Sequence, residues 1–108
     1  MKNFKRRQLN THRIMRSQSI YKVPQGKLLK ISIDYDEKKN KIRDIRITGD
    51  FFAYPEEAIE LMETQLRNTV IEREQLQEKI QSIIKEYHIE FIGVNAEGLT
   101  QGILMCTL

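Results

Sequence analysis

The fold of this chain is decided by residues 27–48, which read KLLKISIDYDEKKNKIRDIRIT. Apolar and polar residues alternate through the first half of this stretch, and the apolar members are Leu29, Ile31, Ile33 and Tyr35. Alternation with a period of two is typical of an antiparallel strand that buries one face. The polar residues 36–40 separate this strand from a second apolar run, so the sequence predicts a β-hairpin.

The return strand is predicted at residues 41–48. Its inward side chains are Ile45 and Ile47, but Ile42 is out of phase with both. One extra residue near Arg43 would return Ile42 to the buried face, because a β-bulge sets two residues of one strand opposite one residue of the other. We therefore expect a bulge at this point of the hairpin.

Helix signals follow the hairpin. Pro55 suits the first turn of a helix. Thr69 and Glu72 have the spacing of a capping box for a second helix, and Asn95 is a good N-cap for a third. The expected fold class is therefore α+β, with a small antiparallel sheet and helices packed on one face of it.

The composition describes one ordinary domain. The chain has 108 residues, of which 40% are hydrophobic and 31% are charged, as in globular proteins generally. It has no apolar run of 18 residues, and its basic N-terminus lacks the apolar segment of a secretory signal. We therefore expect a cytoplasmic protein that does not enter a membrane.

Basic residues are concentrated near the N-terminus. Residues 1–30 contain nine of the 18 Lys and Arg residues and no Asp or Glu, so the other nine and all 15 acidic residues give residues 31–108 a formal charge of −6. A turn signal at residues 24–26 marks the start of the folded body. We divide the chain into a basic N-terminal arm, residues 1–20, and a domain, residues 21–108. The domain is expected to fold without residues 1–19.

Several partners suit such a basic arm. It can grip nucleic acid, a membrane surface or an acidic protein, or it can be a solvated tail. Aromatic side chains that could stack on bases are scarce, since residues 1–30 contain only Phe4 and Tyr21. A small basic nucleic-acid-binding protein is the alternative hypothesis for the function.

The sequence lacks the common catalytic motifs. It has no glycine-rich phosphate loop, no CxxC and no HExxH. His12 and His88 are far apart and have no obvious co-ligand. The lone cysteine, Cys106, cannot form an internal disulfide and is expected to be a buried structural thiol, because apolar residues surround it in the sequence. No catalytic residue and no metal site is assigned to this chain.

One constellation is less ordinary. Its members are Lys27, at the start of the first strand, and Gly49, Asp50, Phe51, Phe52 and Pro55, after the second strand. Adjacent side chains of an extended segment point to opposite sides. If one phenylalanine belongs to the core, the other is covered by something else. That cover could be another part of this chain or a partner, and both readings stay open.

The order of these motifs resembles the C-terminal accessory domain of bacterial lipoate–protein ligases, and resembles even more the stand-alone accessory subunit of two-chain ligases. The resemblance covers roughly residues 20–108, and the Gly-Asp-Phe-Phe stretch with Pro55 is its most specific part. The chain departs from the family at Gln25, where a glycine is common, and at Asn68, which also stands in place of a glycine. Asn68 is a mild departure because asparagine tolerates left-handed backbone.

The resemblance implies a function shared by two chains. A separate catalytic chain would hold ATP, magnesium and lipoate, and this chain, bound to it in a heterodimer, would be needed to make lipoyl-adenylate. The lipoyl group would then pass to a lysine of a lipoyl domain or of a glycine-cleavage H protein. The less ordinary constellation would be the partner-binding or functional segment. The implied fold is that of sulfur-acceptor and iron–sulfur scaffold proteins, but the cysteines of those scaffolds are absent.

Overall fold

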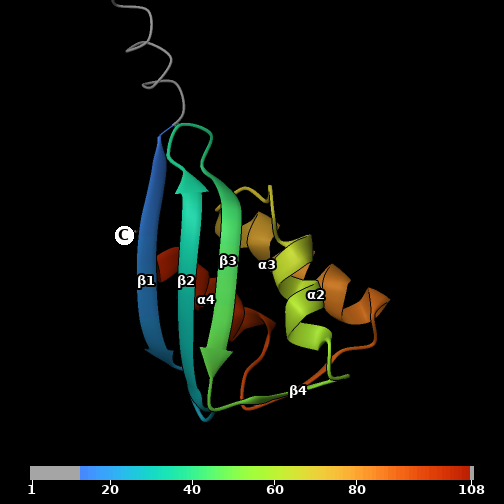
Figure 1. The fold of residues 1–108 in the computed structure, drawn as a ribbon. Helices are drawn as coiled ribbons and strands as arrows, with labels where there is room; N and C mark the ends of the chain where they lie inside the picture. Colours follow the sequence, from blue (N-terminus) through green and yellow to red (C-terminus); the bar gives the residue numbers. More distant parts are fainter. Residues whose placement is uncertain (1–12, 108) are drawn as a thin grey trace, which may run out of the picture.

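Two antiparallel sheets and a layer of helices form the domain (Figure 1). The structure, a computed structural model, describes residues 13–107. The larger sheet has the order β1-β2-β3, with β1 at Ile14–Lys22, β2 at Leu28–Asp36 and β3 at Lys41–Gly49. The smaller sheet, which we call the β4–β5 ribbon, pairs β4 (Phe52–Tyr54) with β5 (Glu90–Ile92). The helices are α2 (Ala58–Gln65), α3 (Arg73–Glu86) and α4 (Ala96–Met105).

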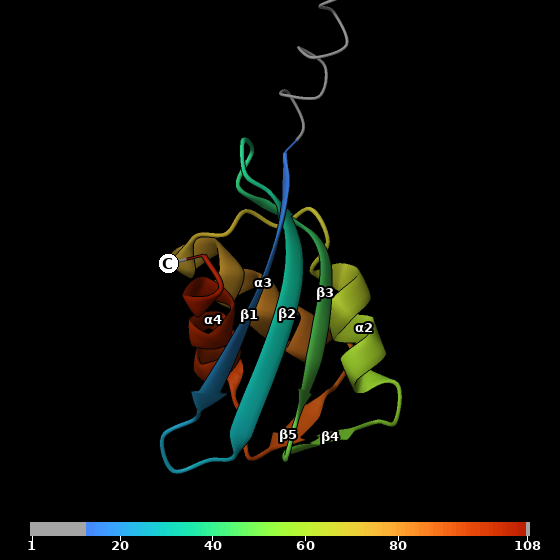
Figure 2. The same ribbon diagram turned by 60° about the vertical axis from the view of Figure 1, so that its left-hand side comes forward.

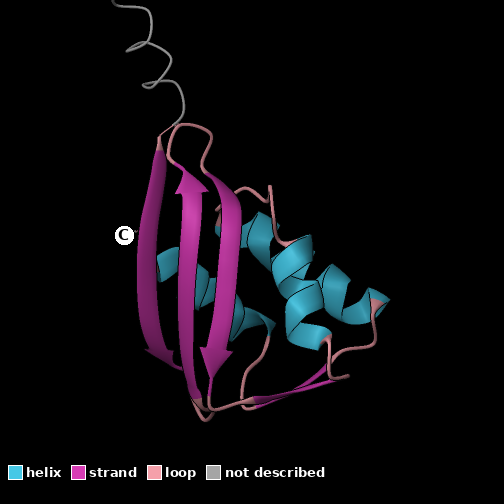
Figure 3. Cartoon of the chain, in the orientation of Figure 1, coloured by secondary structure: helices cyan, strands magenta, loops and turns pink. Residues whose placement is uncertain are grey.

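The helices cover one face of the larger sheet and leave the other face open (Figures 2 and 3). Helix α4 packs on β1 and β2, α2 packs on β3, and α3 packs mainly on α4. The predicted α+β fold class is confirmed. Within the described residues, no helix is long and apolar enough to cross a membrane.

The predicted hairpin and its bulge are confirmed. Strands β2 and β3 pair from Leu29↔Gly49 to Asp34↔Asp44, and the register then shifts to Tyr35↔Ile42. Arg43 is the residue left without a partner in this ladder. The apolar side chains of both strands reach the core as expected, except that Tyr35 is only partly buried; the fully enclosed members are Leu29, Ile31, Ile33, Ile42, Ile45 and Ile47.

The predicted boundary between arm and domain falls inside a strand. Strand β1 pairs along its whole length with β2, from Ile14↔Asp36 to Lys22↔Leu28. Ser19 is buried, and its hydroxyl donates to the Gly102 carbonyl oxygen of α4 at 2.6 Å. Residues 14–20 are therefore part of the folded domain, because they form the edge strand of the sheet and α4 packs against that strand. Residues 1–12 of the predicted arm lie outside the described residues.

Helix α3 begins later than the capping box predicted. Its first residue is Arg73, and no side chain caps its N-terminus. The backbone after Thr69 is used in tertiary pairing, since the Ile71 N–H donates to the Asn40 carbonyl oxygen at 2.8 Å. Attachment to the hairpin therefore overrides the local helix signal. The predicted Asn95 cap of α4 is confirmed, with its side chain accepting from the Gly98 N–H at 2.7 Å.

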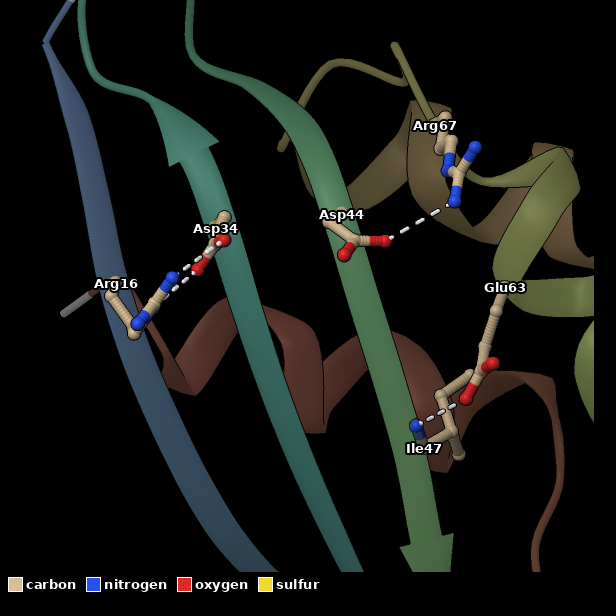
Figure 4. A network of polar contacts seen from close by, with 6 residues as sticks. All are labelled: Arg16, Asp34, Asp44, Ile47, Glu63 and Arg67. Atoms are coloured by element: carbon tan, nitrogen blue, oxygen red, sulfur yellow. Dashed lines mark hydrogen bonds and ion pairs between the residues drawn. The ribbon is translucent and has the colours of Figure 1, made fainter.

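The open sheet face and the β3 edge carry polar contacts (Figure 4). Arg16 donates through Nε to Asp34 at 2.9 Å, and this hydrogen bond lowers the pKa of the Asp34 carboxyl. Exposed ion pairs of this kind contribute little to stability. On the other side, the Glu63 carboxylate of α2 accepts from the Ile47 N–H at 2.8 Å. That contact occupies an edge donor that could otherwise pair with a foreign strand.

Candidate functional site

The segments singled out in the sequence meet at one end of the molecule, where β1 turns into β2 and β3 ends (Figure 1). The Lys27 N–H donates to the Gly93 carbonyl oxygen at 2.8 Å. The Asp50 N–H donates to the Leu28 carbonyl oxygen at 3.0 Å. The first hydrogen bond joins the β1–β2 turn to the end of β5, and the second joins the end of β3 to the start of β2. Residues far apart in the sequence therefore form one site at the base of the β4–β5 ribbon.

Glycines allow the backbone segments of this site to approach closely. Gly49 has a φ of +154°, and a Cβ atom there would lie 2.2 Å from the Leu28 carbonyl oxygen. A Cβ atom at Gly26 would lie 2.5 Å from the Gly93 carbonyl oxygen. Both obstacles are backbone atoms, which cannot rotate away as a flexible side chain can. The geometry of the site therefore depends on these positions having no side chain.

Pro55 lies at the far end of β4 from Gly49. It precedes α2 instead of opening it as predicted, because the chain first makes a turn in which the Pro55 carbonyl oxygen accepts from the Ala58 N–H at 2.9 Å. Of the predicted site residues, Lys27 and residues 49–52 are brought together, and Pro55 marks where the ribbon passes into α2.

The two adjacent phenylalanines face opposite ways, as expected. Phe51 points inward and meets the Phe91 ring edge to face, with centroids 6.2 Å apart. Phe52 points outward and is 72% exposed. Aromatic pairs in this geometry contribute about 0.5–1.5 kcal/mol beyond the area they bury. Phe51 therefore anchors the ribbon to the body, while Phe52 is free of the core.

An apolar surface covers the outer side of the ribbon. Phe52 stands directly opposite Ile92 in the ladder, and Tyr54 is on the same side of β4 because it is two residues further on. Tyr54 is 70% exposed and Ile92 is 67% exposed. We call these three side chains the ribbon face. Tyr54 and Ile92 were not predicted as site residues, although the spacing of Phe52 and Tyr54 is a period-two signal in the sequence.

The one cysteine of the chain has a structural position. Cys106 is buried, and burial raises the pKa of its thiol, while a hydrogen bond to Ser19 acts in the opposite direction. A buried neutral thiol is a poor nucleophile, so the expected structural role of Cys106 is confirmed. Among residues 13–107, no group of three or more His, Cys, Asp or Glu could hold a metal ion.

Comparison with known proteins identifies the domain. The model of the family described as the bacterial lipoate protein ligase C-terminus matches residues 22–101. This chain belongs to that family. Lipoate-protein ligase A subunit 2 of Thermoplasma acidophilum is 35% identical to it over 79 residues, which cover 70% of this chain and 76% of the relative.

A solved structure of a lipoate protein ligase has the same fold as this chain. It contains a bi-partite lipoate protein ligase and its E2 lipoyl domain from Thermoplasma acidophilum. A chain in it matches with a TM-score of 0.65 and 29% sequence identity, covering 85% of this chain and 96% of that chain. The family matched is the one that the sequence resembles, so that resemblance is confirmed. The chain is thereby placed in the accessory part of a lipoate–protein ligase.

Replacing Phe51 and Phe52 separately should show that Phe51 stabilises the fold and that Phe52 does not. Phe51→Ala should lower the free energy of unfolding by about 1–3 kcal/mol, because it removes a partly buried ring and its contact with Phe91. Phe52→Ala should change it by less than about 0.5 kcal/mol, because the ring is exposed. Urea unfolding of both variants measures the difference. Equal losses would contradict the assignment of Phe52 to the surface.

Proposed function

We propose that this chain is the accessory subunit of a two-chain lipoate–protein ligase and is needed, with a separate catalytic chain, for ATP-dependent activation of lipoate to lipoyl-adenylate. The observation that carries the proposal is the 35% identity to a relative named subunit 2, over 76% of that relative's length. A chain that matches most of the length of a known ligase subunit is expected to act as one.

The proposal assigns the small ligands to the catalytic chain. ATP, magnesium and lipoate bind there, and the two chains form a heterodimer. The lipoyl group afterwards passes to a lysine of a lipoyl domain or H protein. This chain contributes a shaped surface, and the residues predicted for that role are Lys27, Gly49, Asp50, Phe51, Phe52 and Pro55.

A docked subunit can shift its partner toward the active arrangement through a difference in affinity. It must bind the active arrangement of the catalytic chain more tightly than the inactive one. A difference of about 1–3 kcal/mol changes the active population by roughly 5–150-fold. A rigid binding surface suits this role, because little of the binding energy is lost in ordering it. Close backbone packing at Gly49 and Gly26 supplies that rigidity.

Lipoate-dependent exchange of pyrophosphate into ATP should require both chains. Each chain alone should give little exchange, and the mixture should give strong exchange, because the adenylate forms only in the complex. Transfer of lipoyl from preformed lipoyl-adenylate to a lipoyl domain should depend less on this chain and serves as the control. Robust exchange by this chain alone, or full exchange by the catalytic chain alone, would contradict the proposal.

A further inference from the structure

We propose that the ribbon face, formed by Phe52, Tyr54 and Ile92, is the surface on which the catalytic chain docks. The contact is apolar at its centre, and basic residues of the catalytic chain surround it. This inference rests on the proposed function and names the place and chemistry of the contact. The β4–β5 ribbon lies at one end of the molecule, between the end of β3 and the start of α2 (Figure 2).

The ribbon face is exposed although its strands are firmly held. The opposite side of the ribbon carries Ala53 and Phe91, which pack against the core. Phe51 reinforces that packing through its contact with the Phe91 ring. An isolated two-stranded ribbon is barely stable in water, so this anchoring fixes the outward side chains in place. Contiguous exposed apolar side chains on a fixed frame are typical of a binding surface.

Aromatic side chains make the ribbon face a strong candidate for binding energy. Phe52 and Tyr54 present large rings with few rotatable bonds, so holding them still costs little entropy. Such rings dominate the energetics of many protein interfaces when a partner's pocket covers them. Ile92 extends the same apolar surface across the ladder from Phe52. A partner therefore needs a complementary apolar patch or pocket.

The charge around the ribbon face specifies the rest of the partner. Residues 49–66 contain five carboxylates and no Lys or Arg. Three of these carboxylates are close in sequence to the ribbon, at Asp50, Glu56 and Glu57, and Glu90 stands opposite Tyr54 in the ladder. Lys27, at the base of the ribbon, is a cation that borders this region. The border is mainly acidic, so the complementary rim on the partner is basic.

The same border argues against other occupants. In a twofold dimer of this chain the two ribbon faces would meet and bring their carboxylates together, because a twofold interface uses the same patch on both copies. Like charges across an interface are unfavourable. Nucleic acid is disfavoured for the same reason, since its phosphates would face Asp50, Glu56 and Glu90. A separate, basic-rimmed protein chain fits the surface best.

Two matched substitutions test the inference in the full-length chain. Phe52→Ala should weaken binding to the purified catalytic chain about 10-fold or more, as for an aromatic interface anchor. Ile20→Ala should leave the affinity unchanged, although Ile20 is 59% exposed, because it lies on β1 away from the ribbon. Isothermal titration calorimetry gives both affinities. The melting temperature of each variant should stay within about 4 °C of the parent, so that binding is separated from folding.

A charge reversal tests the basic rim. Glu90→Lys should slow association with the catalytic chain several-fold at low salt, and the difference should shrink as salt is raised, because rim charges act mainly on the association rate. Unchanged association would overturn the basic-rim part of the proposal.

The outcomes separate the inference from the proposed function. Loss of affinity with Phe52→Ala but not with Ile20→Ala supports the ribbon face. If Phe52→Ala binds the catalytic chain as tightly as the parent, or if both variants lose the same affinity, the ribbon face is not the docking surface. The proposed function then stays intact, provided that both variants still stimulate pyrophosphate exchange. Failure of the unmodified chain to bind and stimulate the catalytic chain overturns the proposed function. Self-association that Phe52→Ala abolishes assigns the surface to a second copy and overturns the inference.

Discussion

Deleting residues 1–20 should abolish cooperative unfolding. The deletion removes most of β1, which pairs with β2 along nine positions and packs on α4. Ser19 would no longer cover Gly102 and Cys106, which lie beneath it. Uncovering the buried face of α4 and part of β2 costs about 1.5–3 kcal/mol for each large side chain exposed. A domain of this size has only about 5–15 kcal/mol of stability to lose.

The control for this deletion is a chain that begins at Arg13. It keeps the whole of β1 and should melt cooperatively, as the full chain does. Circular dichroism melts of the three forms make the comparison. A cooperative melt for the chain that begins at Tyr21 would show that the domain folds without most of β1, as the sequence alone suggested for a chain without residues 1–19. The structure leads us to expect the reverse.

Strand β1 escaped the sequence analysis for a physical reason. The side chains that it turns toward α4 are small or flexible, at Met15, Ser17 and Ser19, with the half-buried Tyr21 after them. Its larger aliphatic residues, Ile14 and Ile20, lie on the open face. In β1 the larger aliphatic residues therefore face solvent and the serines face the helices, which is the reverse of the usual alternation. Serine suits position 19 because α4 approaches closely there, and the Gly102 carbonyl oxygen satisfies the buried hydroxyl.

The hairpin was predictable because both of its determinants are local. The alternation in β2 and β3 fixes which face is buried, and the phase error at Ile42 can be corrected only by an extra residue. The start of α3 was not predictable in this way. Its capping box competes with the pairing of Ile71 to Asn40, and these residues are far apart in the sequence.

Part of the candidate site could be predicted. Residues 49–52 stood out because a glycine turn followed by two phenylalanines is unusual and because the family carries it. Ile92 did not stand out, since its exposure depends on β5 pairing with β4, a contact between segments about 40 residues apart. Only that pairing turns Phe52, Tyr54 and Ile92 into one surface. The site is thus a product of tertiary structure.

Gly49→Ala should be the most damaging single change at the candidate site. Gly49 ends β3 with a φ of +154°, a conformation that residues with a Cβ atom rarely adopt and that costs them about 1–3 kcal/mol. The added atom would also lie 2.2 Å from the Leu28 carbonyl oxygen and 3.1 Å from the Phe51 ring. Forcing an extra group into a packed site costs about 1–3 kcal/mol. We expect the free energy of unfolding to fall by about 2–4 kcal/mol.

The variant should also lose function beyond its loss of stability. Relief of the overlap must move the end of β3 away from β2, which breaks the bond between the Asp50 N–H and the Leu28 carbonyl oxygen. Phe51 would shift with it, and the ribbon face would lose its fixed position. Pyrophosphate exchange with the catalytic chain, measured well below the melting temperature, should therefore fall even where the variant is folded. Thr48→Ala, an exposed neighbour on the same strand, is the matched control and should leave both exchange and unfolding nearly unchanged. A Gly49→Ala chain with the parent's unfolding midpoint and full exchange would show that the close approach at Leu28 is not required.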